Sequence, residues 1–256
     1  MPERSPEALL DLLQARSGLV CAVGAGGKKT TLYRLMRTHP GRAGLSATVF
    51  TLRFPRNLGA QTVIEPGAGL RAAVVDAARR HRKVAFAQPC EKRGRVAGPA
   101  PDLLADCHQA AGFDVTLVKA DGARMRPIKA PSPQEPVLPP GTATVLYLVS
   151  ALALGQPLDE SVAHRPQAFS ALTGLGLGEP IQPLHVARLL GADAGAFQHV
   201  GDAHVIPIIN AVEDSGRLKL ARRAAEAALT ANPRLDRVVL ATMRREPPVR
   251  EVLWRD

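Results

Sequence analysis

One segment near the amino terminus, residues 20–31 (VCAVGAGGKKTT), constrains the fold more than any other. Its first residues form a short apolar run that predicts a buried strand, and residues 32–38 predict a helix. The glycine cluster between them predicts a tight strand-to-helix turn. Glycines without Cβ allow backbone N–H groups to converge on an anion, and a helix amino terminus adds a positive dipole end. The segment therefore predicts a phosphate-binding turn of the P-loop type.

The spacing of this segment differs from the P-loop pattern G-x-x-x-x-G-K-[ST] in either register of its two lysines. If Lys28 is the phosphate-binding lysine, Ala22 stands at the first glycine position and Lys29 at the Ser/Thr position. If Lys29 takes that role, the Lys29-Thr30 pair fits, but Lys28 stands at the second glycine position. The register stays open, and a glycine-rich turn without a ligand is the structural alternative.

The alternation of strand and helix patterns along 256 residues predicts one α/β domain over 1–256. We expect a three-layer P-loop NTPase-like fold with a mostly parallel sheet. Residues 47–52 (ATVFTL) predict the second strand, ending in a basic loop at 53–56. Residues 150–203 are compatible with a helical sub-lobe, and the charged tail from Met243 is expected to be peripheral.

The charge balance of the chain is strongly basic, with a formal net charge of +10 and a pI near 10.2. Such a balance favours an anionic partner, although many arginines can simply solvate helix surfaces. Specific nucleic-acid binding is disfavoured, because only 4% of the residues are aromatic and no known DNA- or RNA-binding motif is present. The oligomeric state stays open.

The sequence favours a cytoplasmic protein without a membrane segment. Its three cysteines, Cys21, Cys90 and Cys107, have neither disulfide nor metal-ligand spacing, which fits a reducing compartment. The amino terminus predicts an amphipathic helix from Ser5 onward rather than a signal peptide. No apolar run reaches the length of a membrane span.

A second candidate site residue follows a later strand. Residues 114–120 (DVTLVKA) predict a buried strand, and Asp121 and Gly122 come directly after it. A carboxylate at the carboxyl end of such a strand, beside a P-loop, is where P-loop NTPases hold Mg²⁺ or its water. An Asp-Gly pair also forms turns without any ligand, and this is the structural alternative.

Residues 123–140 (ARMRPIKAPSPQEPVLPP) form the most unusual segment of the chain. Its six prolines exclude a helix and a central strand, so we expect an extended loop with little conformational freedom. The loop carries Arg124, Arg126, Lys129 and Glu135, and its cations are suited to clamp phosphates or another acidic group near the strand-end carboxylate. A rigid linker between two lobes is the alternative.

Two further positions complete the set of candidates. His164 and Arg165 precede a predicted short helix and are suited to face the same cleft, although a lone histidine is more often structural. Asn210 follows a predicted strand and begins a weak match to the guanine-recognition loop N-K-x-D of GTPases. In that match Ala211 replaces the lysine and Glu213 the aspartate. The choice between ATP and GTP therefore stays open.

Taken together, these segments resemble the YqeC-like accessory protein family, which is associated with maturation of selenium-dependent molybdenum hydroxylases. The resemblance rests on VGAGGKKTT (23–31), ADGARMRPIKAP (120–131), EPVLP (135–139), AHR (163–165) and INAVED (209–214). The second and third runs are its specific part, because no general phosphate-binding fold requires them. The resemblance implies a P-loop NTPase-like fold and a role in processing a molybdenum–pterin enzyme.

This chain departs from the family pattern at two places. Family members usually carry an acid before the A-D-G run, where this chain has Lys119. They also tend to have a threonine-rich stretch with a histidine after the second strand, where this chain has residues 50–54 (FTLRF). A cation near a Mg²⁺ site opposes metal binding, so hydrolysis that is slow or lost is compatible with this sequence.

Two functional hypotheses follow from the residues and the resemblance. In the first, the chain is an ATP- or GTP-dependent accessory protein, an NTPase or a kinase, in the maturation of a molybdenum-cofactor-containing hydroxylase, with selenium as an open question. In the second, it is a non-catalytic chaperone or scaffold that binds the molybdopterin cofactor or the apo-enzyme, and Lys119 favours this version. The expected partners are a nucleotide with Mg²⁺ and the hydroxylase or its cofactor.

The first hypothesis assigns a role to each candidate residue. The nucleotide would be bound by Gly24, Ala25, Gly26, Gly27, Lys28, Lys29, Thr30, Thr31 and Asn210, and Mg²⁺ by Thr30 (or Thr31) and Asp121. The catalytic set would be Lys28, Lys29, Asp121, Arg124, Arg126, Lys129, His164 and Arg165. The turn lysines would reach the γ-phosphate, and the loop cations would neutralise charge as the phosphoryl group leaves, or hold an anionic pterin.

Overall fold

The computed structural model describes residues 7–255 and has an α/β fold. These residues contain seven α-helices and a mostly parallel nine-stranded sheet. The predicted fold class and the mostly parallel sheet are therefore confirmed, whereas the P-loop NTPase identity of the fold stays a prediction. Ser5, where the sequence predicts the first helix to start, lies outside the described residues. No helix within 7–255 is both long and apolar enough to cross a membrane.

The chain divides into two compact units, each assembled from several segments. Unit 1 contains the described residues up to Ala22 together with 31–121 and 137–144. Unit 2 contains residues 23–30 and 122–136, and the described residues from Val145 onward. The expected single domain with a helical sub-lobe stays a prediction.

Unit 1 is built on neighbouring parallel strands. In sheet order they are β1 (Gly18–Gly24), β7 (Val115–Lys119), β2 (Ala43–Ala47), β5 (Lys83–Ala87) and β4 (Gln61–Ile64). Nearly all their residues except those of β4 are buried. Parallel strands with helices on both faces bury both sides, which explains why these strands read as continuous apolar runs.

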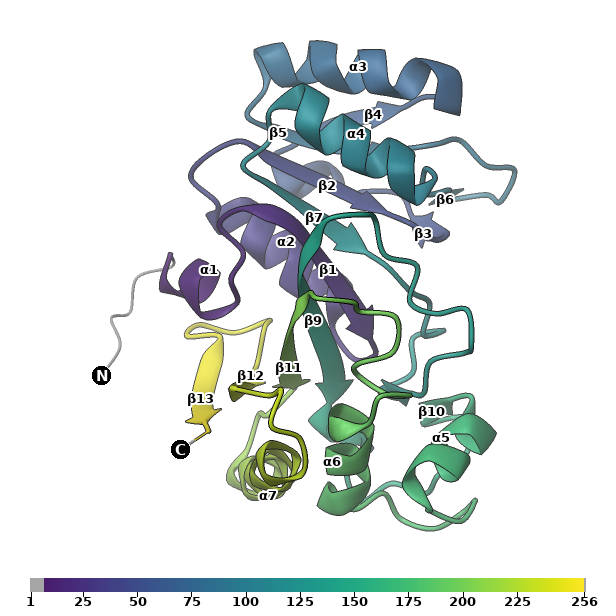
Figure 1. The fold of residues 1–256 in the computed structure, drawn as a ribbon, viewed down its shortest axis with the longest axis vertical. Coiled ribbons are helices and arrows are strands. Elements are labelled where there is room, and N and C mark those ends of the chain that lie inside the picture. Colours follow the sequence, from purple (N-terminus) through teal and green to yellow (C-terminus); the bar gives the residue numbers. More distant parts are fainter. Residues whose placement is uncertain (1–6, 256) are drawn as a thin grey trace. The chain divides into compact units, whose positions relative to one another are not determined.

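The helices of unit 1 pack on this sheet and on each other. They are α1 (Ala8–Leu12), α2 (Lys28–Thr38), α3 (Gly67–Arg80) and α4 (Pro101–Ala111), with a short 3-10 helix at Arg56–Leu58. α3 contacts α4, β4 and β5 (Figure 1). α4 begins with a proline, whose missing N–H is not needed there, and ends at Gly112 in the left-handed conformation (φ 61°).

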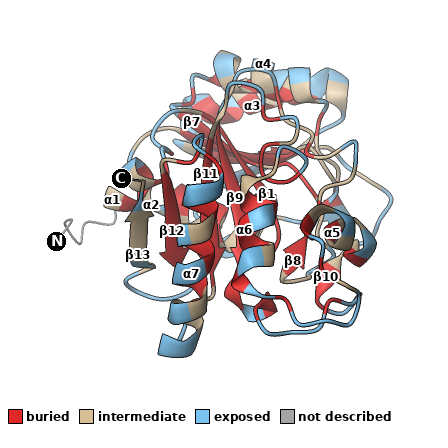
Figure 2. Cartoon of the chain, turned by 60° about the horizontal axis from the view of Figure 1, so that its bottom comes forward, coloured by how far each residue is buried: buried red, intermediate tan, exposed pale blue. Residues whose placement is uncertain are grey.

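Unit 2 is built on the other strands of the sheet. In sheet order they are β13 (Val249–Trp254), β12 (Arg237–Ala241), β11 (His204–Asn210) and β9 (Thr142–Ser150), of which β11 and β12 are parallel. The helices are α5 (Pro166–Thr173), α6 (Pro183–Gly191) and α7 (Ser215–Ala231), with a 3-10 helix at Ala151–Ala153. α6 packs against α5 and α7, and Figure 2 shows α6 and α7 in front of the buried strands β9, β11 and β12.

The second strand of the sheet is β2 at Ala43–Ala47, so the sequence prediction of a strand at 47–52 is wrong. The residues of β2 are small because space is limited: a Cβ on Gly44 would overlap Phe113 and Thr116. This close packing overrides the higher β-propensity of the residues that follow. The predicted segment ends instead in β3 (Thr51–Leu52), a short strand antiparallel to β6 (Arg95–Val96).

The carboxyl tail is also not peripheral, contrary to the sequence prediction. Residues 249–254 form β13, which pairs antiparallel with β12 at the edge of the sheet. The segment VREVLW mixes apolar and charged residues in the way that is typical of a half-exposed edge strand. Its last residue, Trp254, lies beneath the guanidinium of Arg237, 5.1 Å from the ring centroid.

Candidate functional site

The glycine-rich turn connects the end of β1 to the start of α2. Gly24, Gly26 and Gly27 all have positive φ angles, of 81°, 78° and 141°. A Cβ at Gly24 or Gly26 would overlap the end of β9, and a Cβ at Gly27 would overlap the side chain of Asn210. The packing of the turn against its own unit therefore requires these glycines, whether or not a ligand binds.

Lys28 is the lysine that folds back over this turn. Its ammonium donates a hydrogen bond to the carbonyl of Gly24, and its side chain is only 6% exposed. Lys29 is less buried than Lys28. The structure thus places the Lys28 ammonium over the turn, and the register of the phosphate-binding lysine stays a prediction.

The backbone amides of the turn differ in how they are used. Ala25 N–H donates to the carbonyl of Leu148 in β9, at 2.7 Å. The N–H groups of Gly26 and Gly27 find no acceptor among residues 7–255. They lie immediately before the amino terminus of α2, where the helix dipole attracts negative charge. Two backbone donors are therefore available to an anion at the start of this helix.

The two threonines that follow the lysines have different environments. Thr30 is partly exposed, whereas Thr31 is fully buried. The Thr31 hydroxyl has no hydrogen-bond partner in the described part of the chain. Thr31 lies three residues after Lys28 and so on the same face of α2. A buried hydroxyl without a partner carries a free-energy cost, which a ligand or metal contact would relieve.

Asn210, at the end of β11, holds the turn from the other side. Its Nδ2 donates to the Gly26 carbonyl at 2.8 Å, and its Oδ1 accepts the Met243 N–H at 2.9 Å. The side chain is buried, with 7% of the residue exposed. Both polar ends of the amide are thus used within the protein. The predicted role of Asn210 in binding a nucleotide stays a prediction, and its observed contacts shape the turn.

The proline-rich loop begins beside the turn. The carbonyl of Pro127 accepts the N–H of Ser150, at 2.9 Å. A Cβ added to Gly26 would meet both of these residues, so the loop and the turn lie against each other.

A buried ion cluster fixes the middle of the loop. Lys129, 1% exposed, pairs with Glu135 at 2.6 Å and donates to the carbonyl of Gly122 at 2.8 Å. Arg165 Nη1 lies 2.7 Å from the same Glu135 oxygen. Burial alone would raise the pKa of Glu135, but the hydrogen bond and charge of Lys129, the hydrogen bond of Arg165 and the N–H of Ser132 hold this pKa at about 2.

The catalytic roles that the sequence assigns to Lys129 and Arg165 stay predictions. In the structure both cations are bound to Glu135, and that position suits them to hold the loop in place. The loop is also tied down by two residues that the sequence analysis does not single out. Gln198 Nε2 donates to the carbonyl of Ser132 at 2.6 Å, and His199 Nε2 lies 2.7 Å from the carbonyl of Pro133. No local sequence signal marks these contacts.

His164 lies beside the ion cluster. The parallel pair β8 (Ile128–Lys129) and β10 (Ala163–His164) aligns His164 with Lys129. Burial, followed by the charges of Arg165, Lys129 and Arg124, lowers the pKa of His164 to about 4. The imidazole is therefore neutral at pH 7 in a positively charged environment, and a bound anion would counteract those charges.

The exposed cations of the loop precede the ion cluster. Arg124 is exposed and Arg126 is partly exposed. Arg124 and Met125 both have positive φ angles, 45° and 63°, which side chains other than glycine adopt only at a cost in free energy. Met125 is 98% exposed, so this strained corner lies at the surface. They are the loop cations that remain accessible to a ligand.

Asp121 belongs to unit 1 and is almost completely buried, with 2% exposed. Lys119 lies beside Ala22 in the register of β7 and β1, and the Ala120 N–H donates to the Ala22 carbonyl at 3.1 Å. Asp121 comes two residues after Lys119, at the carboxyl end of β7. This is the strand-end position that the sequence predicts for it.

Comparison with known proteins finds a matching family model. The family model described as "YqeC protein" matches residues 20–167, more than half of the chain. The chain belongs to the YqeC family. The match includes the glycine-rich turn, Asp121, the proline-rich loop and the His164–Arg165 pair, whereas Asn210 lies beyond it.

A curated YqeC relative extends the similarity. The chain is 28% identical over 204 residues to the "Uncharacterized protein YqeC" of Escherichia coli (strain K12). The similar region covers 76% of this chain and 77% of the relative. The expected resemblance is thus confirmed at the level of the family.

Proposed function

We propose that this YqeC protein binds a Mg²⁺–nucleoside triphosphate, ATP or GTP, at the turn between β1 and α2. The observation that supports this most is the position of Lys28, whose ammonium is held over the turn by the Gly24 carbonyl. On binding, a β-phosphate would accept hydrogen bonds from the Gly26 and Gly27 amides. The Lys28 ammonium would then move from its carbonyl to the terminal phosphates.

A Mg²⁺ ion would arrive with the nucleotide, and two buried side chains of unit 1 carry oxygen atoms of the kind that it binds. The ion would lower the charge repulsion between phosphate oxygens, and it prefers oxygen ligands. The hydroxyl of Thr31 is buried without a hydrogen-bond partner in residues 7–255, and the carboxylate of Asp121 is buried at the end of β7. We assign Thr31, rather than Thr30, as the hydroxyl ligand on this ground, with Asp121 holding the ion or its water.

The wider role that we propose is that of an accessory protein in the maturation of a molybdenum-cofactor-containing hydroxylase. The support is membership of the YqeC family together with the association of that family stated above. In this role Arg124 and Arg126 are the groups suited to an anionic pterin or to phosphates, because they are accessible. Lys129 and Arg165 would fix the loop that presents them.

A second version has one specific observation in its favour. Lys119 precedes Asp121 by two residues at the carboxyl end of β7, and its positive charge opposes a metal ion at close range. In this version the protein is a chaperone or scaffold for the molybdopterin cofactor or the apo-hydroxylase. It would bind nucleotide, if at all, as a switch with little or no hydrolysis.

Titration calorimetry and a phosphate-release assay on the pure protein test these versions together. Saturable binding of ATP or GTP that weakens when Mg²⁺ is chelated supports the proposed site. Turnover above that of an Asp121→Asn variant favours the NTPase version, whereas binding without turnover favours the scaffold. No binding of either nucleotide at millimolar concentration would overturn the proposal.

A further inference from the structure

The short strands β3 and β6 form a two-stranded sheet of their own in unit 1. Along the chain β3 follows β2 and β6 follows β5 (Figure 1). Because β2, β5 and β7 are parallel, both short strands come after carboxyl ends of the unit 1 sheet, the edge that also carries Asp121. Residues 50–56 and 90–96, which contain the two strands, are called the β3–β6 surface below.

The register of the two strands separates an inner face from an outer face. Thr51 lies opposite Val96 and both are buried, whereas Leu52 lies opposite Arg95 and both are exposed. Phe50 comes two residues before Leu52, and these two side chains are 48% and 45% exposed. The outer face therefore presents large apolar side chains next to a cation.

The β3–β6 surface also carries an excess of positive charge. Its exposed cations are Arg53, Arg56, Lys92, Arg93 and Arg95. Glu91 is the one acid in its sequence, and Lys92 Nζ lies over the Phe50 ring, 4.3 Å from the centroid. Within residues 7–255 none of the five cations forms an ion pair, whereas the exposed Arg71 of the same unit pairs with Asp106. The chain itself therefore does not balance the charge of this surface.

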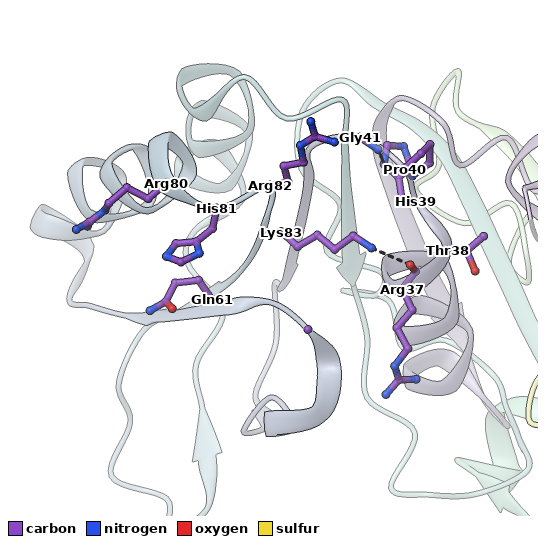
Figure 3. Close-up of a pocket in the computed structure, with 11 residues that line it drawn as sticks. Arg37, Thr38, His39, Pro40, Gly41, Gln61, Arg80, His81, Arg82 and Lys83 are labelled. Carbon is purple, nitrogen blue, oxygen red and sulfur yellow. Dashed lines mark hydrogen bonds between the residues drawn. The ribbon is translucent and has the colours of Figure 1, made fainter.

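A polar cavity elsewhere in unit 1 is also basic, but its cations do not converge (Figure 3). Lys83 Nζ donates to the Arg37 carbonyl at 2.7 Å. Figure 3 shows the side chains of Arg37 and Arg82 on opposite sides of Lys83, directed away from each other. Arg80 is already paired with Asp76. The β3–β6 surface differs because its cations are unpaired and lie beside exposed apolar side chains.

We propose that the β3–β6 surface docks an acidic segment of a partner protein that carries large apolar side chains. Its carboxylates would pair with Arg53 and Arg95, because a guanidinium binds a carboxylate through two parallel hydrogen bonds. Its apolar side chains would cover Phe50 and Leu52 and remove them from water. Aromatic side chains and arginine are enriched in protein–protein interfaces. This docking does not depend on the nucleotide site proposed at the turn.

Charge and exposure argue against three other occupants. A second copy in a twofold contact would bring the same five cations against each other. A nucleic acid would stack its bases on aromatic rings, and Lys92 already covers one face of the Phe50 ring. A membrane requires apolar side chains that reach below the headgroups, whereas Phe50 and Leu52 are half covered on the face of a sheet. An acidic protein segment satisfies both the charge and the apolar side chains.

Selection from a randomised peptide library displayed on phage, against the immobilised full chain, tests the proposal. We expect the enriched peptides to combine aspartate or glutamate with large apolar residues. In fluorescence anisotropy the Leu52→Ser/Arg95→Gln variant should bind them roughly tenfold more weakly than the parent or worse, the loss expected for one apolar contact and one charged pair. The matched control, Leu177→Ser/Arg79→Gln, removes an exposed leucine and an exposed arginine outside the surface. It should leave the affinity nearly unchanged.

Equal losses in the two double variants, or enrichment of peptides without acids, would overturn the proposal. Failure to enrich any peptide above an uncoated support would overturn it as well. Cosedimentation with phosphatidylserine vesicles examines the lipid alternative. Vesicle binding that Leu52→Ser/Arg95→Gln abolishes, without any peptide binding, would assign the surface to a membrane instead.

If the surface variant does not fold, amide chemical shifts of the parent chain with an enriched peptide decide. Shifts at residues 50–56 and 90–96 support docking at the β3–β6 surface. Shifts confined to other residues exclude it.

Discussion

Asn210 donates a hydrogen bond to the backbone of Gly26 at 2.8 Å and so joins the end of β11 to the glycine-rich turn. The other end of the same amide accepts the N–H of Met243, beyond the end of β12. A Cβ added to Gly27 would overlap the side chain of Asn210, so the close packing of the two requires a glycine at this position. Asn210 is therefore placed to set the shape of the turn, and a direct contact with a nucleotide base would require it to give up one of these bonds.

Replacing Asn210 by alanine should therefore weaken phosphate binding without changing base preference. The Gly26 carbonyl and the Met243 N–H would lose their partner, at about 1–3 kcal/mol for each buried group. We expect the affinities for ATP, GTP and inorganic tripolyphosphate to fall by the same factor, about tenfold. Asn57→Ala, at an exposed position in unit 1, is the control and should have no effect. A changed ratio of ATP to GTP affinity would instead indicate base recognition.

The ion cluster of the loop predicts a specific acid dependence of stability. The pKa of Glu135 falls from 4.5 to about 2 on folding, so its ionised form stabilises the native state. This contribution is complete above pH 4.5 and is lost as the pH falls towards 2. Its size is about 3 kcal/mol. Urea unfolding should show Glu135→Gln less stable than the parent at pH 7, with a smaller difference at pH 3.

The exposed Glu160, for which the described residues show no ion pair, provides the control. Glu160→Gln should change the free energy of unfolding little at either pH. If Glu135→Gln lowered stability equally at both pH values, its effect would come from packing and not from its charge.

His164 should report on anion binding through its protonation. In the free protein its pKa is about 4, because burial and the charges of Arg165, Lys129 and Arg124 disfavour the imidazolium. Since this folded value lies below 6.5, stability linked to His164 is present above pH 6.5 and falls as the pH drops towards 4. A phosphate bound near these cations should raise the pKa. NMR titration with and without saturating ATP measures it, with His164→Gln assigning the resonance.

An unchanged His164 resonance on saturation with ATP would mean that the nucleotide does not reach the loop cations. Binding at the turn could still occur in that case, so the result separates the turn from the proline-rich loop. Ionic strength must be held constant, because salt also screens the arginines.

Lys119 should limit any hydrolysis that the protein performs. Its replacement by glutamate removes a cation two residues before Asp121 and adds an acid, which should strengthen Mg²⁺ binding and raise the turnover of ATP or GTP. Lys219→Glu, at an exposed position on α7, makes the same charge change elsewhere. Equal turnover rates for Lys119→Glu, Lys219→Glu and the parent would show that Lys119 does not limit hydrolysis.

Local sequence signals predict the elements of this fold well where one residue pattern decides them. The helix predicted at 32–38 lies within α2 (Lys28–Thr38), and the strand predicted at 114–120 forms as β7 (Val115–Lys119), because their apolar patterns and end signals are clear. The strand at 43–47 is missed because small residues are selected there by packing against Phe113 and Thr116. Strand β13 is missed because an edge strand carries a weak pattern of its own.

In the candidate site, too, local sequence patterns predict single segments but not the contacts between residues that are far apart in the sequence. The glycine-rich turn is visible in the sequence, but the register of its lysines depends on how Lys28 folds back within the formed turn. The pairing of Glu135 with Arg165 joins residues far apart in sequence, so a single chain gives no signal for it. Asn210 is noticed as a base-recognition candidate, whereas its contacts with the turn need the folded sheet.

The most direct test of the central claim compares Lys28→Ala with Lys29→Ala by titration calorimetry of Mg²⁺–ATP and Mg²⁺–GTP. We expect the parent to bind at least one nucleotide. We expect Lys28→Ala to lose roughly tenfold to a hundredfold in affinity, the value of one charged hydrogen bond. Lys29→Ala, which removes the same charge one residue later, should lose less than threefold. A parent that binds neither nucleotide, or equal losses in the two variants, would contradict the claim that Lys28 and the Gly24 turn form a nucleotide site.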